Sequence, residues 1–216
     1  GMLPKEFLER FAQMSQFGEA TGEGSIRFSK SQGLMLNAAI GDETPLKADS
    51  SFLTFREKVR KFEGVKTADA PEGFKGKLRE YQREGLTWLK FLEEFESGGI
   101  LADDMGLGKT IQILAFLQSR ARKNKMPSLV VTPKSLAFNW IDEAAKFVPG
   151  LKLVRYAGTG RTKRLSDLQK ADLVVTTYGA VRTDIEKLET IQFDIAIVDE
   201  AQAIKNPKAQ AAQAVK

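Results

Sequence analysis

The chain has 216 residues and a formal net charge of +5, and its 42% hydrophobic content predicts a folded protein with a buried core. It contains neither cysteine nor histidine, which excludes disulfides, thiolate zinc sites, thiol nucleophiles and Ser-His-Asp catalysis. Any chemistry therefore falls to carboxylates, lysines and bound cations.

Targeting signals are missing from the sequence. No apolar run approaches the ~20 residues that a membrane span requires, and the amino terminus lacks the apolar core of a signal peptide. We therefore expect a cytoplasmic protein without a membrane partner. Gly1 before Met2 is typical of a residue left by tag removal, which indicates a fragment of a longer protein.

Residues 1–66 are predicted to form a small α+β accessory region, the tail of an upstream domain. Apolar residues recur at helical spacing in 3–17 and in 51–62. Between these helices we expect a hairpin with one strand at Ile26 and Phe28 and the other at Leu34 and Leu36. No chemistry is predicted here, and residues 67–77 are expected to be a linker.

Residues 77–95 predict an amphipathic helix with Gln82 on the same stripe as Leu78, Leu89 and Leu92. One interpretation of Gln82 is a glutamine at the edge of a core. The other is an amide that pairs with adenine, because its donor and acceptor match the N6 and N7 positions. The residues alone leave both interpretations open.

The sequence GGILADDMGLGKT, which ends at Thr110, predicts a short strand followed by a phosphate-binding loop. Gly106 and Gly108 allow a sharp turn and close approach of backbone amides, Lys109 supplies a cation, and Thr110 supplies a hydroxyl for magnesium. The usual loop has a glycine five residues before Gly108, where this chain has Asp103. The loop thus departs from the general pattern at one position.

From this loop onward, apolar and amphipathic segments alternate. Strands are expected at 100–102, 128–132, 152–156, 172–177 and 193–198, and helices at 110–123, 135–147, 161–169 and 180–188. Such alternation predicts an α/β fold with a mostly parallel sheet and helices on both faces. Ligands of such sheets bind at the carboxyl ends of the strands.

The last predicted strand ends in two adjacent carboxylates, Asp199 and Glu200. Buried carboxylates are costly without a cation or hydrogen bonds. Beside a phosphate loop, we assign Asp199 to a magnesium ion and Glu200 to the orientation and deprotonation of the attacking water.

Residues 151–170 contain six basic side chains and one acidic side chain, so their surplus equals the whole net charge. This basic run has two interpretations. It is either a contact surface for the phosphate backbone of a nucleic acid or a solvated helix and loop.

Taken together, the motifs resemble those of the Swi/Snf-related ATPases of helicase superfamily two, particularly the bacterial ones. The similar motifs are LREYQREG at 78–85, the glycine loop, VTPKS at 131–135 with Asn139-Trp140, YAG at 156–158, VTTY at 175–178 and DEAQAIKN at 199–206. That family has an acidic residue at the place of Asp103. The resemblance covers about residues 75–216, and residues 1–66 match none of these motifs.

The resemblance implies that residues 78–216 form a RecA-like first motor lobe that uses ATP and Mg²⁺. The implied nucleotide-binding residues are Arg79, Gln82, Asp104, Met105, Gly106, Leu107, Gly108, Lys109 and Thr110. The implied catalytic residues are Lys109, Asp199, Glu200 and Gln202, and the implied magnesium ligands are Thr110 and Asp199. The residues implied to contact the DNA backbone, without reading its base sequence, are Pro133, Lys134, Ser135, Thr176, Thr177 and Tyr178.

The implied function is an ATP-dependent translocase or remodeller of double-stranded DNA, associated with the bacterial nucleoid and acting on protein clients. The alternatives are a scaffold with a degenerate motor, an RNA-dependent ATPase of superfamily two, and a small-molecule P-loop kinase, which would require an arginine-rich lid. Only 14 residues follow Gln202, so we expect the second lobe and its arginines in the full-length protein. The fragment alone is expected to be nearly inactive.

Overall fold

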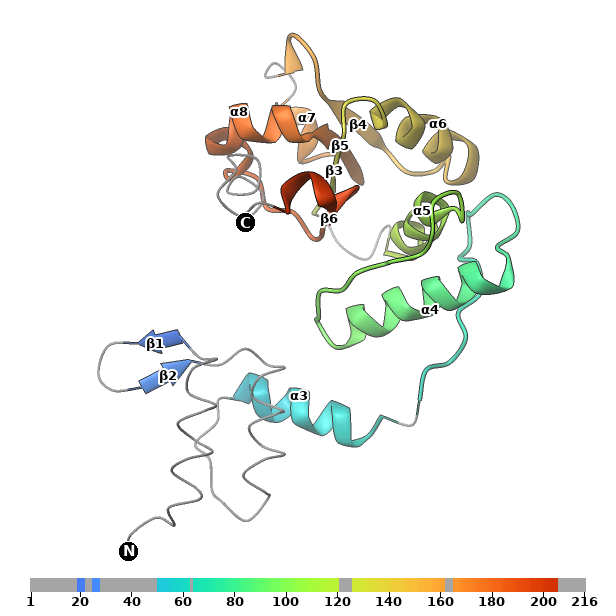
Figure 1. The fold of residues 1–216 in the computed structure, drawn as a ribbon, viewed down its shortest axis with the longest axis vertical. Helices are drawn as coiled ribbons and strands as arrows, with labels where there is room; N and C mark the ends of the chain where they lie inside the picture. The colour runs from blue at the N-terminus through green and yellow to red at the C-terminus, as the bar shows by residue number, and fades with distance from the viewer. Residues whose placement is uncertain are drawn as a thin grey trace, which may run out of the picture. The chain divides into compact units, whose positions relative to one another are not determined.

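A computed structural model of the chain describes residues 19–21, 25–27, 50–62, 64–120, 126–161 and 165–205. The chain forms two compact units, Gly1–Gly64 and Val65–Lys216 (Figure 1). In the described residues, no helix has both the length and the apolar character needed to span a membrane.

The first unit contains a two-stranded antiparallel sheet and a helix. β1 (Glu19–Thr21) pairs with β2 (Ser25–Arg27), with Ala20 opposite Ile26. The predicted strand at Ile26 is confirmed, but its described partner precedes it, because a three-residue connection with two glycines favours pairing of neighbouring segments. α3 (Ser50–Arg60) confirms the second predicted helix. The helix expected at 3–17 and the strand expected at Leu34 and Leu36 lie outside the described residues.

The second unit is built on a four-stranded parallel sheet in the order β4-β5-β3-β6. Its strands are β3 (Ser128–Thr132), β4 (Leu153–Tyr156), β5 (Leu173–Thr177) and β6 (Ala196–Val198). The register places Val130 beside Val175 on one side and beside Ile197 on the other. Since all four strands are parallel, their carboxyl ends meet at one edge of the sheet, which we call the carboxyl edge.

Helices cover both faces of this sheet (Figure 1). The helices of the second unit are α4 (Glu80–Glu94), α5 (Lys109–Arg120), α6 (Ala137–Phe147), α7 (Leu165–Leu168) and α8 (Tyr178–Leu188). Leu114 of α5 and Trp140 of α6 share a core with Val130, whereas Val181 of α8 shares a second core with Val131. Adjacent strand residues therefore point into opposite cores. The predicted α/β class with helices on both faces is confirmed.

The strand predicted at 100–102 is wrong. These residues have no strand pairing, and Ile100 is 83% exposed. The apolar run is only three residues long and lies between two glycines and two aspartates, so little apolar surface is gained by adding it to the sheet. Side-chain hydrogen bonds hold the following residue instead, since Gln112 and Lys109 both donate to Asp103.

The segment expected to be a linker, residues 67–77, belongs to the second unit and packs against its helices. The amide of Ala68 donates to Thr87 Oγ1 of α4 at 2.8 Å, and Ala68 itself is buried. Phe74 stacks on Phe147 of α6, and the Lys75 amide donates to the Phe147 carbonyl at 2.7 Å. Residues 67–77 therefore contact both α4 and α6 within the second unit.

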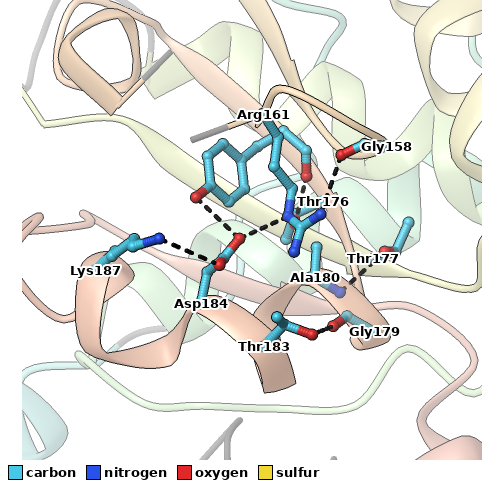
Figure 2. A network of polar contacts seen from close by, with 10 residues as sticks. Gly158, Arg161, Thr176, Thr177, Gly179, Ala180, Thr183, Asp184 and Lys187 are labelled. Carbon is cyan, nitrogen blue, oxygen red and sulfur yellow. Dashed lines mark hydrogen bonds and ion pairs between the residues drawn. The ribbon is translucent and has the colours of Figure 1, made fainter. Parts of the chain in front are cut away.

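A buried polar network holds the loop after β4 against α8 (Figure 2). Asp184, which is 5% exposed, interrupts the helical geometry of α8 with φ −119° and ψ 24°. Its Oδ2 atom accepts from Arg161 Nε at 2.6 Å and from Tyr156 Oη at 3.2 Å. Lys187 lies 3.7 Å from the other carboxylate oxygen but remains half exposed. Arg161 also donates to the Gly158 carbonyl, so this one carboxylate organises the turn after β4.

Asp184→Ala is expected to lower the free energy of unfolding by about 3 kcal/mol, because it leaves the Arg161 guanidinium without its partner in a partly buried position. Lys187→Ala is the control and should cost less than about 1 kcal/mol, since its ion pair is long and exposed. Urea unfolding followed by circular dichroism measures both. Equal effects of the two substitutions would show that the buried carboxylate has no special structural role.

Candidate functional site

The glycine loop leads directly into the amino terminus of α5. Gly106 and Gly108 have φ values of +83° and +75°, the left-handed conformation that glycine adopts at low cost. Lys109, the first residue of α5, donates from Nζ to the carbonyls of Asp103 at 2.6 Å and Asp104 at 3.0 Å. The loop thus curls around its own lysine, and one of the three ammonium donors remains for an anion at the helix amino terminus.

Gln82 connects α4 to this loop. Its Oε1 atom accepts from the Arg79 amide at 3.0 Å, which caps α4, and its Nε2 atom donates to the Leu107 carbonyl at 3.1 Å. A Cβ atom at Gly108 would lie 2.7 Å from Nε2, so the amide of Gln82 packs directly against the loop backbone. The helix starts at Glu80 and not at 77 because Arg79 is the capping residue. Gln82 is 6% exposed and therefore supports the loop from inside.

Asp103 is fixed by a residue of α5 that sequence reasoning did not single out. Gln112 is fully buried, and its Nε2 atom donates to Asp103 Oδ2 at 2.8 Å. A Cβ atom at Gly85 would lie 1.7 Å from Gln112 Oε1, so only glycine at this point of α4 leaves room for the glutamine. The aspartate that replaces the usual glycine of the loop therefore has a structural partner of its own.

The direction of α5 places the glycine loop toward the carboxyl edge of the sheet. Arg120, the last residue of α5, donates to Asp194 Oδ2 from Nη2 at 2.6 Å. Asp194 bonds through its amide to the Pro127 carbonyl, just before β3 begins. The carboxyl terminus of α5 is thus at the amino edge of the sheet. Lys109 lies at the other end of this 12-residue helix, roughly 17 Å away and toward the ends of β3 and β6.

Asp199 follows β6 at the carboxyl edge and is held by neutral donors. Its Oδ2 atom accepts from Thr132 Oγ1, at the end of β3, and from Trp140 Nε1, on α6, both at 2.9 Å. The Asp199 amide donates to the Val131 carbonyl at 2.9 Å and extends the pairing with β3. The carboxylate therefore has one oxygen occupied by two donors, while Oδ1 accepts no hydrogen bond from the described part of the chain.

Glu200 has a left-handed backbone, with φ 51° and ψ 53°, and precedes the short helix η2 (Ala201–Ile204). This conformation costs a residue with a Cβ atom about 1–2 kcal/mol. Gln202 donates from Nε2 to Glu200 Oε2, so the two predicted catalytic side chains are in direct contact. The turn directs the backbone away from the sheet immediately after the two carboxylates.

Tyr178, the first residue of α8, contacts the backbone of the turn at Asp199 and Glu200. Its hydroxyl donates to the Asp199 carbonyl at 2.5 Å and lies 3.4 Å from the Glu200 carbonyl. Burial, with the negative charges of Asp199 and Glu200, raises the pKa of Tyr178 to about 12. The hydroxyl thus stays protonated at neutral pH and keeps donating to the turn.

The residues predicted to contact DNA fall into two groups. Lys134 and Ser135 are exposed just before α6, next to the half-buried Pro133. Thr176, in contrast, is fully buried and donates to the Tyr156 carbonyl at 2.8 Å. Thr177 caps α8 by accepting from the Ala180 amide. The hydroxyls of both threonines are thus used within the fold.

The basic run at 151–170 does not form one free surface. Arg155 lies over the Phe138 ring, 4.3 Å from guanidinium carbon to centroid, and Arg161 is paired with Asp184. Both arginines line a depression of about 340 Å³ together with residues 157–160. Lys152 and Lys170 are exposed, and residues 162–164 lie outside the described part. At least two of the six cations therefore have partners inside the unit.

These residues fit magnesium and a nucleotide phosphate. Mg²⁺ prefers oxygen ligands from one or two carboxylates together with phosphate and water. Asp199 offers its Oδ1 atom, and Thr110 offers a hydroxyl in the first turn of α5. Among the described residues there is no cluster of three or more acidic, histidine or cysteine side chains. The donor set is thus suited to a metal that arrives with phosphates, not to a metal caged by protein alone.

Comparisons with known proteins find similar sequences and a similar fold. The model of the SNF2-related domain matches residues 81–216. The TATA-binding protein-associated factor mot1 of Aspergillus fumigatus is 40% identical over 183 residues, which are 78% of this chain and 10% of that protein. The putative ATP-dependent helicase/translocase YwqA of Bacillus subtilis is 39% identical over 148 residues, 66% of this chain and 16% of that protein.

A solved structure gives the same fold. The Sulfolobus solfataricus SWI2/SNF2 ATPase core in complex with double-stranded DNA is 35% identical, with a TM-score of 0.64. The similarity covers 69% of this chain and 31% of that one. The chain thus spans only a small part of the length of each of these relatives.

Proposed function

Because the chain belongs to the SNF2-related domain family, and because similar proteins include a putative ATP-dependent helicase/translocase, we propose that it is the nucleotide-binding lobe of a motor that moves along double-stranded DNA. One observation carries the proposal. An ATPase site is predicted in two halves, the loop around Lys109 and the carboxylates Asp199 and Glu200. In each half, hydrogen bonds to neighbouring residues hold the charged side chains.

The nucleotide would lie at the carboxyl edge of the sheet. Lys109 and the backbone amides of the glycine loop would hold its phosphates, and Arg79 and Gln82 would lie near its base. Gln82 keeps a second N–H and a second acceptor lone pair for adenine while it supports the loop. Thr110 and Asp199 would hold magnesium, which would neutralise phosphate charge when bound.

Hydrolysis requires a base beside the last phosphate. We assign this role to Glu200, which would orient a water molecule and accept its proton. Gln202 donates to the same carboxylate and would therefore move with the Glu200 side chain. Tyr178 holds the backbone of this turn, so the direction of the Glu200 side chain depends on α8 as well as on β6.

The DNA part of the proposal is supported by the exposed Lys134 and Ser135 and by the DNA complex of the Sulfolobus solfataricus structure. We further propose that the full-length protein carries a second lobe in cis and displaces proteins bound to DNA. Its proposed location is the cytoplasm of a bacterium, in association with the nucleoid. The scaffold alternative is disfavoured because Lys109, Thr110, Asp199 and Glu200 are all present.

Lys109→Ala is expected to weaken binding of magnesium-ADP by about 10- to 100-fold, because it removes a charged donor from the phosphates. Isothermal titration calorimetry of the 216-residue chain measures this loss. Lys146→Ala, an exposed lysine in the last turn of α6, is the matched control and should bind as the unchanged chain does. Unaltered binding by Lys109→Ala would contradict the placement of the phosphates.

A further inference from the structure

Two buried side chains hold Asp199 without being part of the proposed catalytic set. Thr132 is fully buried at the end of β3, and Trp140 is 3% exposed on α6. Both donate at 2.9 Å to Oδ2 of Asp199. They come from a strand and a helix, so the carboxylate is held from two different elements of the fold.

This arrangement fixes the direction of the remaining oxygen. A carboxylate that accepts two bonds at Oδ2 cannot rotate freely, and Oδ1 is left without a hydrogen bond from the described residues. The indole N–H is a donor only, and it cannot exchange roles as a hydroxyl does. Its surroundings are apolar, since Trp140 packs with Leu114, Val130 and Val175. The bond therefore cannot be replaced by one to solvent.

We propose that Trp140, together with Thr132, is a positioning residue that aims Oδ1 of Asp199 at the magnesium ion, and this inference rests on the proposed function. Partners of a metal ligand that do not touch the metal typically change metal affinity by about 10- to 100-fold when they are removed. Trp140 lies in the first turn of α6, five residues after the exposed Ser135. The direction of the carboxylate thus depends on the position of the helix that follows the proposed DNA contact.

Trp140→Phe removes the N–H donor and keeps an aromatic ring in the core. The test is ADP binding by the 216-residue chain, measured by calorimetry over a series of Mg²⁺ concentrations and in EDTA. Mg²⁺ should strengthen ADP binding, and we expect the Mg²⁺ concentration that gives half of this effect to rise about 10-fold in Trp140→Phe. The affinity for ADP in EDTA should stay unchanged. Trp88→Phe, which alters a 42% exposed tryptophan on α4, is the control and should leave both values unchanged.

A second pair of variants separates positioning from packing. Thr132→Val removes the other donor with almost no change of shape and should raise the Mg²⁺ requirement as Trp140→Phe does. Thr132→Ser keeps the hydroxyl and should need the same Mg²⁺ concentration for ADP binding as the unchanged chain. Unfolding midpoints of all variants show whether the fold is retained.

The fluorescence of Trp140 gives a readout that is independent of affinity. The chain has two tryptophans, so Trp88→Phe leaves Trp140 as the sole tryptophan, and excitation that is selective for tryptophan reports on it alone. Magnesium-ADP should change its emission, because a cation at Oδ1 withdraws charge from the carboxylate that accepts the indole N–H, whereas ADP in EDTA should not.

The outcomes distinguish the two proposals. If the unchanged chain binds no nucleotide with or without Mg²⁺, the proposed function fails and the inference fails with it. If the chain binds magnesium-ADP but Trp140→Phe keeps the same Mg²⁺ requirement, only the inference is overturned. Equal weakening with Mg²⁺ and in EDTA also overturns it, since that result indicates a packing role.

Discussion

A protein that joins this chain to the second motor lobe of its family is expected to hydrolyse ATP about 10³- to 10⁵-fold faster than the 216-residue chain alone. The reason is electrostatic, because the transition state of phosphoryl transfer spreads negative charge over the transferred group. Lys109 already donates to two carbonyls of the glycine loop, so only one of its three N–H donors remains for this charge. We expect the additional arginines in the other lobe, because the resemblance to Swi/Snf-related ATPases implies them there.

Steady-state ATP hydrolysis of the two proteins, at equal concentration and with saturating double-stranded DNA, measures the difference. The extended protein with Lys109→Ala is the control, because it keeps the arginines but loses the phosphate contact in this lobe. If the chain alone turned over ATP as fast as the extended protein, the site would be complete within one lobe, and the need for arginines from the other lobe would be refuted.

The second large effect is expected from Glu200→Gln, which should lower ATP hydrolysis in the extended protein by about 10²- to 10⁴-fold. The amide keeps the size of the side chain but cannot accept a proton from water. Binding of ATP should be retained, because Lys109 and the glycine loop are untouched.

Glu186→Gln, which makes the same chemical change on the exposed side of α8, is the matched control and should leave the rate unchanged. A rate assay paired with a filter-binding measurement of ATP separates chemistry from binding. Hydrolysis by Glu200→Gln within twofold of the unchanged protein would remove the general base from this position.

Most elements of the second unit could be predicted from the sequence, because strands buried on both faces form continuous apolar runs and helices repeat their apolar residues every three to four positions. β3 matches its predicted bounds, and β5 differs from its prediction by one residue. The segment at 100–102 shows the limit of such patterns. Local apolar character predicts a strand, but pairing depends on distant partners that the pattern does not contain.

The residue types of the proposed site can be read from the sequence. A lysine, a threonine and two carboxylates in this order indicate phosphate and magnesium chemistry from the sequence alone. The residues that support them were not predictable in the same way. Gln112 behind Asp103 and Trp140 behind Asp199 become visible only when segments far apart in sequence are folded together. The sequence signal for such a supporting residue is a polar side chain on an otherwise apolar helix face. Gln82 is an example, since it lies on such a face and bonds to the glycine loop.

Thr176 shows that a motif residue can also have a structural use within the fold. A threonine at the carboxyl end of a parallel strand is well placed for a ligand, but its hydroxyl satisfies the Tyr156 carbonyl inside the sheet. Buried backbone acceptors compete for such side chains, and a motif does not reveal which use prevails. Contact with DNA is therefore expected from the exposed Lys134 and Ser135 before it is expected from Thr176.

We propose that this lobe belongs to a motor driven along double-stranded DNA. The most direct measurement is the ATP hydrolysis rate of the protein that contains this chain, titrated in parallel with double-stranded DNA, single-stranded DNA and RNA, with Glu200→Gln as the inactive reference. We expect duplex DNA to give the strongest stimulation and Glu200→Gln to show none. Stimulation by RNA alone, or equal rates with and without any nucleic acid, would contradict the claim.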